Sequence, residues 1–346
     1  MPERLTDRRP EVPADALVAA MVPPPRFDDV RFATYRPDPS EPSQQAALDA
    51  AEGFAARVPG EATRRGLFGR LRGGGRSRAA EGRPGLYLDG GFGVGKTHLL
   101  ASLWHAAPGP KAYGTFVELT SLVGALGFRP TVEALSGFRL LAIDEFELDD
   151  PGDTVLVSTL LGELVDAGVR LAATSNTQPE DLGEQRFAAE DFLREIQGLA
   201  AHFDVQRVEG EDYRHRGLAE PPPPVPSEDV ERRASATPGA TVDDFGALCA
   251  HLATLHPSRY GWLLDGVPLV GLTEVSAVAD QAVALRLGVL VDRLYDRKVP
   301  VVASGVGVGD LFGEELLRGP HRKKYQRAVS RLGALMREAE TADRAA

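Results

Sequence analysis

Short, nearly all-apolar runs alternate with amphipathic stretches in the central part of the chain. Residues 86–88, 140–143 and 169–174 are runs of this kind, and 203–208 offers another strand. Such runs are typical of strands that are buried on both faces of a parallel sheet. Because helix-like stretches lie between them, the pattern predicts an α/β fold with helices covering both faces of the sheet.

The segment before this core has a different pattern. Alanines and larger apolar residues recur near helical spacing over residues 43–58, which predicts a helix. Residues 63–83 carry three consecutive glycines among many arginines, a composition that buries little and predicts a flexible basic loop. The alternative for that loop is a contact with nucleic acid or an acidic tail. We therefore expect an N-terminal extension over 1–84, followed by the core over 85–220.

The pattern changes again after the core. A proline run followed by charged and small residues predicts a linker over 221–240. Beyond it, apolar residues within 245–255 share one helical face, which predicts a second compact region over 241–346. This region weakly repeats the helix, strand and loop order of the core around residues 299–304. We expect it to contribute a strand and to have mixed α/β character, and that strand could return to the main sheet.

Composition limits the class of protein. With 346 residues and 43% hydrophobic content, the chain has room for two domains and a substantial core. A net charge of -11 argues against nucleic acid or an anionic membrane as the main partner, since those partners select a strongly basic surface. Cys249 is the only cysteine, which fits a reducing compartment. No apolar stretch reaches the ~18 residues of a membrane span, so we expect a cytoplasmic protein without integral membrane association.

The strongest chemical signal follows the first apolar run. Residues 90–97 match the pattern G-x-x-x-x-G-K-[ST] of a phosphate-binding loop between a strand and a helix. Its glycines let backbone N–H groups point at phosphates, and the helix adds its positive N-terminal end. Lys96 is expected to neutralise phosphate charge, and the Thr97 hydroxyl to ligate Mg²⁺. The predicted nucleotide-binding residues are Gly90, Gly91, Phe92, Gly93, Val94, Gly95, Lys96 and Thr97.

Two carboxylates end the apolar run at 140–143. A buried strand here would deliver Asp144 to the carboxyl edge of the sheet, where it can hold Mg²⁺. Glu145 would then lie beside the γ-phosphate and polarise the attacking water as a general base. An Asp-Glu pair is common at strand ends. Following a phosphate-binding loop, however, it supplies the missing half of a triphosphatase site.

Polar residues also end the next predicted strand, which reads Thr174-Ser175-Asn176. The Asn176 amide could hydrogen-bond the attacking water or the γ-phosphate, although Ser and Asn also often cap turns and helices. Arg186 and Arg194 follow, and either could reach the γ-phosphate of a neighbouring subunit as an arginine finger. Most arginines are solvated surface groups, so the pattern alone does not choose between them.

Taken together, these motifs resemble an AAA+ ATPase and, more narrowly, the ZapE family of cell-division ATPases and its mitochondrial relatives. The narrower resemblance lies in residues 85–88, 174–176 with 179 and 181–182, 212–214, 245–249, 290–296 and 327–332, and it covers most of the chain from about residue 30. It implies a P-loop NTPase with an AAA+-like three-layer sheet. It also implies an ATPase, rather than a GTPase, that works as an oligomer and remodels a protein partner, in bacteria the FtsZ division ring.

The resemblance also bears on the arginines. Gln185-Arg186 matches the first pair of a family pattern, Gln-Arg followed by Phe-Leu-Pro, which implies that Arg186 is the trans-acting finger. Residues 192–194 read Phe-Leu-Arg where the pattern has proline, so Arg194 remains an alternative. Family members usually carry a His- and Arg-rich segment after the loop helix, which residues 111–122 lack. This departure implies an altered contact with the partner.

The sequence therefore predicts a Mg²⁺-dependent ATPase with ATP and Mg²⁺ as cofactors and a protein substrate, for which FtsZ is the leading candidate. Glu145, Asn176 and Arg186 are the predicted catalytic residues, and Thr97 and Asp144 the metal ligands. A rival is a DNA-associated AAA+ ATPase of the helicase-loader or transposase-helper type, which the acidic charge and the long C-terminal region disfavour. A scaffold that binds nucleotide without hydrolysis is disfavoured because both Lys96 and Glu145 are present.

Overall fold

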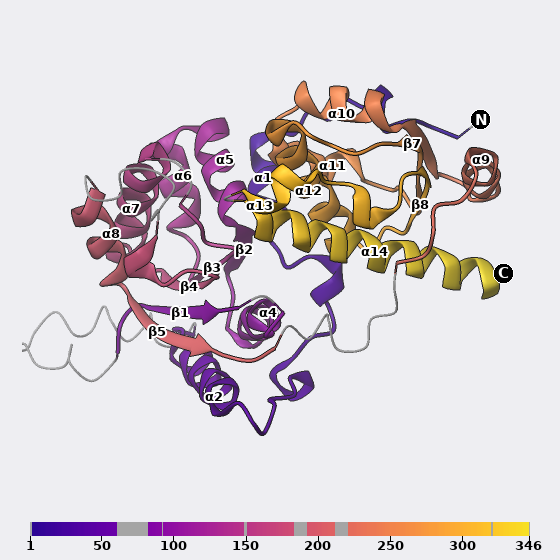
Figure 1. Cartoon of the computed structure of the whole chain (residues 1–346). Helices are drawn as coiled ribbons and strands as arrows, with labels where there is room; N and C mark the ends of the chain where they lie inside the picture. Colours follow the sequence, from indigo (N-terminus) through magenta and orange to yellow (C-terminus); the bar gives the residue numbers. More distant parts are fainter. Residues whose placement is uncertain are drawn as a thin grey trace, which may run out of the picture. The chain divides into compact units, whose positions relative to one another are not determined.

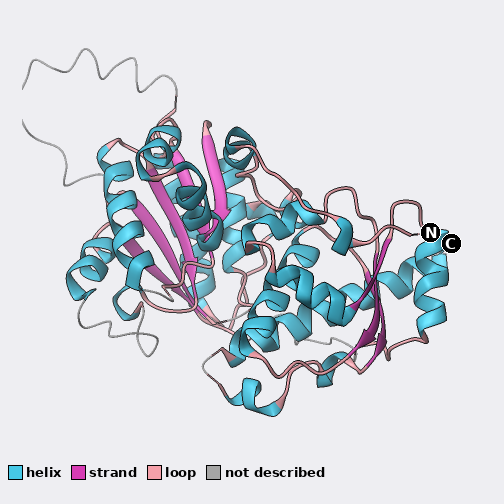
Figure 2. Cartoon of the chain, turned by 90° about the horizontal axis from the view of Figure 1, so that it is seen from above, coloured by secondary structure: helices cyan, strands magenta, loops and turns pink. Residues whose placement is uncertain are grey.

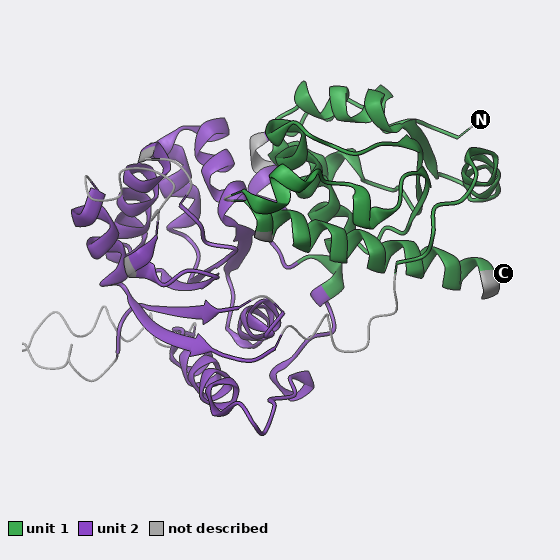
Figure 3. Cartoon of the chain, in the orientation of Figure 1, with its two compact units in different colours: residues 1–12, 24–26, 217–346 green, residues 13–23, 27–216 purple. Residues whose placement is uncertain are grey.

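The computed structural model describes residues 2–60, 82–91, 93–148, 151–182, 192–211, 221–319 and 321–345. The chain divides into two compact units (Figure 3). Unit 1 comprises Met1–Val12, Pro24–Arg26 and Gly217–Ala346, and unit 2 comprises Pro13–Pro23 and Phe27–Arg216. Each unit has its own sheet and its own hydrophobic core.

Within its described residues, unit 2 contains a five-stranded parallel sheet in the order β2-β3-β4-β1-β5. The strands are β1 (Gly85–Gly90), β2 (Lys111–Thr115), β3 (Leu140–Asp144), β4 (Arg170–Ser175) and β5 (Phe203–Val208). One face is covered by α2 (Pro42–Arg57) and α4 (Lys96–Ala106) (Figure 1). The other is covered by α5 (Phe116–Leu126), α6 (Phe128–Leu135), α7 (Pro151–Asp166) and α8 (Leu193–Ala200), and α1 (Ala14–Ala19) packs on α5. The predicted three-layer α/β fold is confirmed.

Alternate residues of each strand face different cores. On β1, Leu86 and Leu88 pack with α2 and α4, whereas Tyr87 packs with α5, α7 and α8. Strand β3 is buried along its whole length, which is why its sequence shows a continuous apolar run. Since the strands are parallel, their carboxyl ends meet at one edge of the sheet. Asp89 on β1 and Asp144 on β3 both lie at that edge, with β4 between the two strands.

As described, unit 1 holds a separate three-stranded parallel sheet in the order β6-β7-β8 (Figure 2). Its strands are β6 (Thr241–Asp244), β7 (Val270–Val275) and β8 (Val301–Gly305). Its helices are α9 (Ser227–Ala236), α10 (Phe245–Ala253), α11 (Tyr260–Leu263), α12 (Gln281–Asp296), α13 (Glu314–Arg318) and α14 (Arg322–Ala345). The strand expected around residues 299–304 is present as β8. It pairs with β7 and does not return to the main sheet, because the segments before and after it build a second core around it.

Short 3-10 helices connect several of these elements. They are η1 (Leu5–Asp7), η2 (Pro25–Phe27), η3 (Phe32–Thr34), η4 (Pro179–Asp181), η7 (Pro257–Arg259) and η8 (Val308–Asp310). Among the helices in the described part of the chain, none combines the length and the apolar character needed to cross a bilayer.

Residues 221–240, where composition predicts a linker, are instead folded into unit 1. The backbone N–H of Val225 donates to the carbonyl oxygen of Ala303 on β8 (2.9 Å). Pro226 is the N-cap of α9, whose Val230 and Ala234 are buried against the sheet. Because only this narrow i, i+4 stripe of a charged helix is apolar, composition alone does not reveal the packing.

The expected N-terminal extension is also divided between the units. Leu5 is buried in unit 1, where the backbone N–H groups of Leu5 and Thr6 donate to the Asp243 carboxylate at 2.9 and 3.0 Å. The helix expected over 43–58 is α2, which belongs to unit 2. Residues 61–81, most of the predicted basic loop, lie outside the described residues.

A mostly buried ion-pair cluster joins α12 to α14. The Asp292 carboxylate on α12 forms ion pairs with Arg327 (2.8 Å) and Arg331 (2.5 Å) on α14, and none of the three side chains is more than 15% exposed. Burial by itself would raise the pKa of Asp292, but the two guanidinium groups outweigh it and hold the pKa below its usual range. Arg327 and Arg331 therefore act as structural partners of Asp292 within unit 1.

We expect Asp292→Asn to lower the free energy of unfolding at pH 7 by about 3–5 kcal/mol, because it leaves two mostly buried guanidinium groups without their counter-charge. Because the pKa of Asp292 is lower in the folded state than in the unfolded state, its ionised form stabilises the fold at pH values above the unfolded pKa of about 3.9. This stabilisation is lost as the pH falls through the folded pKa. The difference between variant and parent should therefore shrink at pH 3. Denaturant unfolding, monitored by circular dichroism at pH 7 and at pH 3, measures this difference in the free energy of unfolding.

The control for this prediction is Asp265→Asn in the same unit. Asp265 pairs with Arg297 at 2.6 Å but is 49% exposed, so its loss should cost only about 0–1 kcal/mol. Equal losses of stability in the two variants would contradict the assignment of Asp292 as a buried anchor.

Candidate functional site

The predicted phosphate-binding loop connects β1 to α4 at the carboxyl edge of the sheet. Gly90 has φ 150° and Gly95 has φ 94°, conformations that L side chains rarely adopt. A Cβ atom on Gly90 would lie 2.0 Å from the carbonyl oxygen of Val208, and one on Gly95 would lie 2.6 Å from Cε2 of Tyr35. Both the backbone conformation and the available space therefore require glycine at these two positions.

Lys96 begins α4, and its ammonium group reaches back across the loop. Its Nζ donates to the carbonyl oxygen of Gly90 (2.8 Å), to that of Gly91, and to Oδ1 of Asn176 (3.0 Å). Asn176 directly follows β4, so the lysine bridges the loop and the neighbouring strand end. This places a point charge where a phosphate held by the loop would need neutralisation.

Asp144 lies at the end of β3 beside the loop. Its Oδ1 accepts from the Thr97 hydroxyl (3.2 Å) and from the Thr174 hydroxyl, and its Oδ2 accepts from the Tyr113 hydroxyl (3.0 Å). The Thr97 and Asp144 contact brings a hydroxyl and a carboxylate together. Oxygen donors of this kind suit Mg²⁺, which is usually held by one or two carboxylates together with substrate phosphates. The residues present therefore fit the predicted metal.

Glu145 follows with a left-handed backbone, φ 54°, which is uncommon for a residue other than glycine. Its backbone N–H donates to Asp144 Oδ1 (3.1 Å) and to Thr174 Oγ1 (3.2 Å). The next N–H, that of Phe146, donates to the carbonyl oxygen of Thr174 (2.7 Å). The turn at Glu145 is thus held by its neighbours in a conformation of a kind that often occurs at functional sites.

Two residues that contact the loop region were not expected from the sequence. Oε1 of Glu147 accepts from Nδ2 of Asn176 at 3.4 Å. The Tyr35 ring packs over the loop, and its hydroxyl donates to the carbonyl oxygen of Val94 (3.1 Å). The run Asp-Glu-Phe-Glu could have drawn attention to Glu147, since it places a third carboxylate after the strand. No local signal marks Tyr35, which lies 59 residues before Val94.

The segment that contains Tyr35 also contacts the start of α4. The ring centroids of Tyr35 and His98 are 5.5 Å apart, and Thr34 Oγ1 lies 3.0 Å from His98 Nε2. Burial lowers the pKa of His98, which favours the neutral imidazole. Residues 34 and 35 therefore tie this segment to the start of α4 through His98.

A buried carboxylate lies at the end of β1, immediately before the loop. Burial raises the pKa of Asp89, and the Arg207 guanidinium, 3.9 Å away on β5, acts against that rise. Asp89 and Arg207 thus form an ion pair at the strand ends that precede the loop.

The structure gathers Lys96, Thr97, Asp144 and Asn176 at one sheet edge, with Glu145 in the turn that follows β3. Phe92 and Arg186 lie outside the described residues, so their predicted roles stay predictions. The alternative finger Arg194 is exposed near the start of α8.

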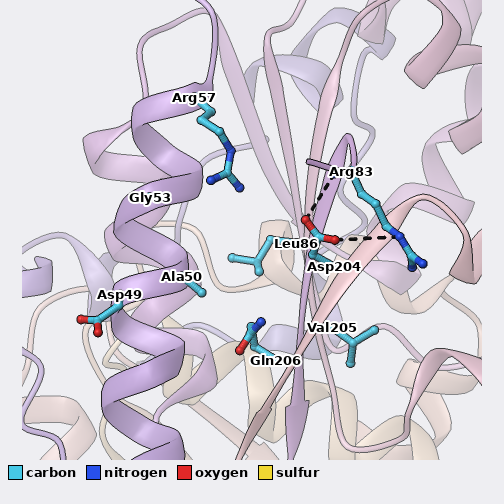
Figure 4. Close-up of a pocket in the computed structure, with 9 residues that line it drawn as sticks. All are labelled: Asp49, Ala50, Gly53, Arg57, Arg83, Leu86, Asp204, Val205 and Gln206. Carbon is cyan, nitrogen blue, oxygen red and sulfur yellow. Dashed lines mark hydrogen bonds and ion pairs between the residues drawn. The ribbon is translucent and has the colours of Figure 1, made fainter. Parts of the chain in front are cut away.

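A polar cavity of about 460 Å³ lies elsewhere in unit 2, between α2 and β5 (Figure 4). Arg83 lines it just before β1. Its backbone N–H donates to Asp204 Oδ2 (3.3 Å), and its Nε lies 3.9 Å from Asp204 Oδ1. Arg83 and Asp204 mark the amino ends of their strands. Because ligands of open α/β sheets bind outside the carboxyl ends, this cavity is separate from the site at the phosphate loop.

Comparisons with known proteins identify relatives. The model of the AFG1-like ATPase family matches residues 11–222 and 219–344. Cell division protein ZapE of Escherichia coli (strain K12) is 27% identical over 300 residues, which cover 73% of this chain and 78% of that protein, and its counterpart in Escherichia coli O157:H7 matches equally.

Similar solved structures include the DnaC helicase loader, with 17% identity and a TM-score of 0.37 over 54% of this chain and 99% of that chain. AMPPCP-bound DnaA from Aquifex aeolicus has 12% identity and a TM-score of 0.39 over 62% and 56% of the two chains. These likenesses are too distant to bear on function.

The two matched ranges of the family model include residues of both units and contain the phosphate loop and the acidic end of β3. The protein is an ATP-hydrolysing enzyme with a P-loop α/β fold in unit 2. The chain belongs to the AFG1-like ATPase family.

Proposed function

We propose that this ATPase couples ATP hydrolysis to the remodelling of a protein partner in cell division, with FtsZ as the leading candidate. The observation that carries the hydrolytic part is the contact of the loop residues Lys96 and Thr97 with Asn176 and Asp144, which joins three neighbouring strand ends into one site. The cell-division part is supported by the similarity to ZapE, a cell division protein of Escherichia coli.

In the proposed mechanism, the loop backbone and Lys96 bind the β- and γ-phosphates of ATP. Thr97 and Asp144 would hold Mg²⁺, which when bound neutralises charge on the phosphate oxygens. Glu145 accepts a proton from the attacking water, and Asn176 helps to position the reacting groups. The hydrogen bonds at the Glu145 backbone hold the base on a turn beside Asp144, close to where the phosphates would lie.

We also propose that the site is completed in a homo-oligomer in the cytoplasm. Arg186 of a neighbouring subunit would stabilise the charge that develops on the γ-phosphate, with Arg194 as the alternative. The net charge of -11 supports a protein rather than a nucleic acid as the main partner, since nucleic-acid binding relies on basic surface.

The test is an ATP-dependent pulldown with the Glu145→Gln variant, which should hold ATP without turning it over. We expect this variant to retain purified FtsZ from the same organism when ATP is present and to release it when ATP is left out. Lys96→Ala is the control, because a protein that cannot bind ATP should retain no FtsZ under either condition. In a parallel assay with purified replicative helicase, ATP-dependent retention of the helicase and not of FtsZ would overturn the division assignment and favour a loader.

A further inference from the structure

Glu147 places a third carboxylate next to the site, and the mechanism above makes no use of it. It lies two residues after Glu145, in the segment that leaves β3, and is only 9% exposed. Burying a carboxylate is unfavourable unless hydrogen bonds compensate for the lost water. One such bond comes from Asn176, whose Nδ2 lies 3.4 Å from Glu147 Oε1.

Asn176 is bound on its other side as well. Its Oδ1 accepts from Lys96 Nζ at 3.0 Å. An ammonium group can only donate hydrogen bonds and a carboxylate can only accept them, whereas an amide has one end of each kind. Asn176 therefore has a single orientation that satisfies both partners, with its NH₂ toward Glu147 and its oxygen toward the phosphate loop.

This orientation limits what Asn176 can do during hydrolysis. If Lys96 turned to a bound phosphate, Asn176 Oδ1 would lose this donor, whereas Nδ2 would still donate to Glu147. An amide oxygen can accept a hydrogen bond from a water molecule but cannot donate one to a phosphate oxygen. The sequence left two roles open for Asn176, binding the attacking water or binding the γ-phosphate. With its oxygen held toward the loop by the contact with Glu147, Asn176 can take the first role but not the second.

We infer that Glu147 is a positioning residue: it keeps the acceptor end of Asn176 toward the phosphate loop, so that Asn176 orients the attacking water instead of binding the γ-phosphate. This inference rests on the proposed mechanism at the same site. Glu147 acts through Asn176 and does not touch the reacting atoms. Its removal should therefore slow turnover and leave ATP binding nearly unchanged.

The test compares Glu147→Met, which keeps the side-chain length but removes the acceptor, with Glu147→Gln, which keeps one acceptor oxygen. We expect Glu147→Met to lower kcat roughly 10- to 100-fold, since small errors in the position of a reacting group have effects of this order. The KM for ATP should change less than about two-fold, and Glu147→Gln should recover part of the lost turnover. Glu133→Met, on an exposed position of α6, is the matched control and should hydrolyse ATP at the parental rate.

A double-mutant cycle separates positioning from general structural support. If Glu147 acts through Asn176, adding Glu147→Met to Asn176→Ala should lower kcat no further. Independent losses, a rise in KM at unchanged kcat, or parental turnover in Glu147→Met would each overturn the inference. If Glu147→Met does not fold by circular dichroism, the same cycle with Glu147→Gln decides.

Failure of the positioning role can be distinguished from failure of the proposed mechanism. Parental turnover in Glu145→Gln would remove the proposed mechanism itself. Loss of turnover in Glu145→Gln together with an unaffected Glu147→Met would remove only the positioning role.

Discussion

Lys96→Ala is expected to abolish ATP binding, with an affinity loss of about 100- to 1,000-fold or more. The Lys96 ammonium is buried and makes three contacts with oxygens of the loop and of Asn176, so it is already oriented toward the phosphate site. Losing a buried charge partner of a phosphate costs about 3–5 kcal/mol, and each 1.4 kcal/mol changes an affinity tenfold. Isothermal titration calorimetry with ATP and Mg²⁺ measures this loss.

The matched control is Lys111→Ala in the same unit. Lys111 donates to the carbonyl oxygens of His105 and Ala107 and lies over the Trp104 ring, so it is a lysine with structural contacts away from the loop. A folded Lys111→Ala protein should bind ATP as the parent does. Unchanged ATP affinity in Lys96→Ala would remove the assignment of the loop.

The second large effect is expected for Glu145→Gln, which should bind ATP normally and lose about 10²- to 10⁴-fold in turnover. The change removes the basic oxygen that accepts a proton from water, and general-base catalysis contributes on this scale. The backbone N–H bonds that hold the left-handed turn do not involve the Glu145 side chain, so the local fold should persist. Steady-state ATP hydrolysis and calorimetry on the same preparation separate turnover from binding.

Glu133→Gln on the exposed face of α6 is the control for the charge change, and it should retain parental turnover. A Glu145→Gln enzyme that hydrolyses ATP at the parental rate would exclude Glu145 as the base. A variant that loses ATP binding as well would instead place Glu145 in the binding of nucleotide.

Local sequence predicted most of the sheet in unit 2, because strands buried on both faces need continuous apolar runs. β1, β3 and β4 correspond to such runs, whereas the edge strand β5 alternates apolar and polar residues. β2 was missed, since Lys111–Thr115 contains few strongly apolar residues and its burial depends on the neighbouring β3 and α4. The folded segment at 221–240 was missed for a related reason, because its burial depends on β7 and β8, which lie far along the chain.

The chemistry of the phosphate loop was determined by the sequence itself. Its glycines, Lys96 and Thr97 all lie within residues 90–97, so their spacing alone specifies a site for phosphate. The same holds for the acidic residues that end a buried strand, because a parallel sheet brings its strand ends to one edge.

Only the tertiary structure decided which side chains meet at that edge. β4 lies between β1 and β3, and this order places Asn176 against Lys96, 80 residues earlier, and against Glu147, 29 residues earlier. The contact between the Tyr35 hydroxyl and the carbonyl oxygen of Val94 likewise joins residues that are 59 positions apart in the sequence. Local pattern carries no information about such pairs. Their contacts follow from strand order and packing, which arise only when distant segments bury a common core.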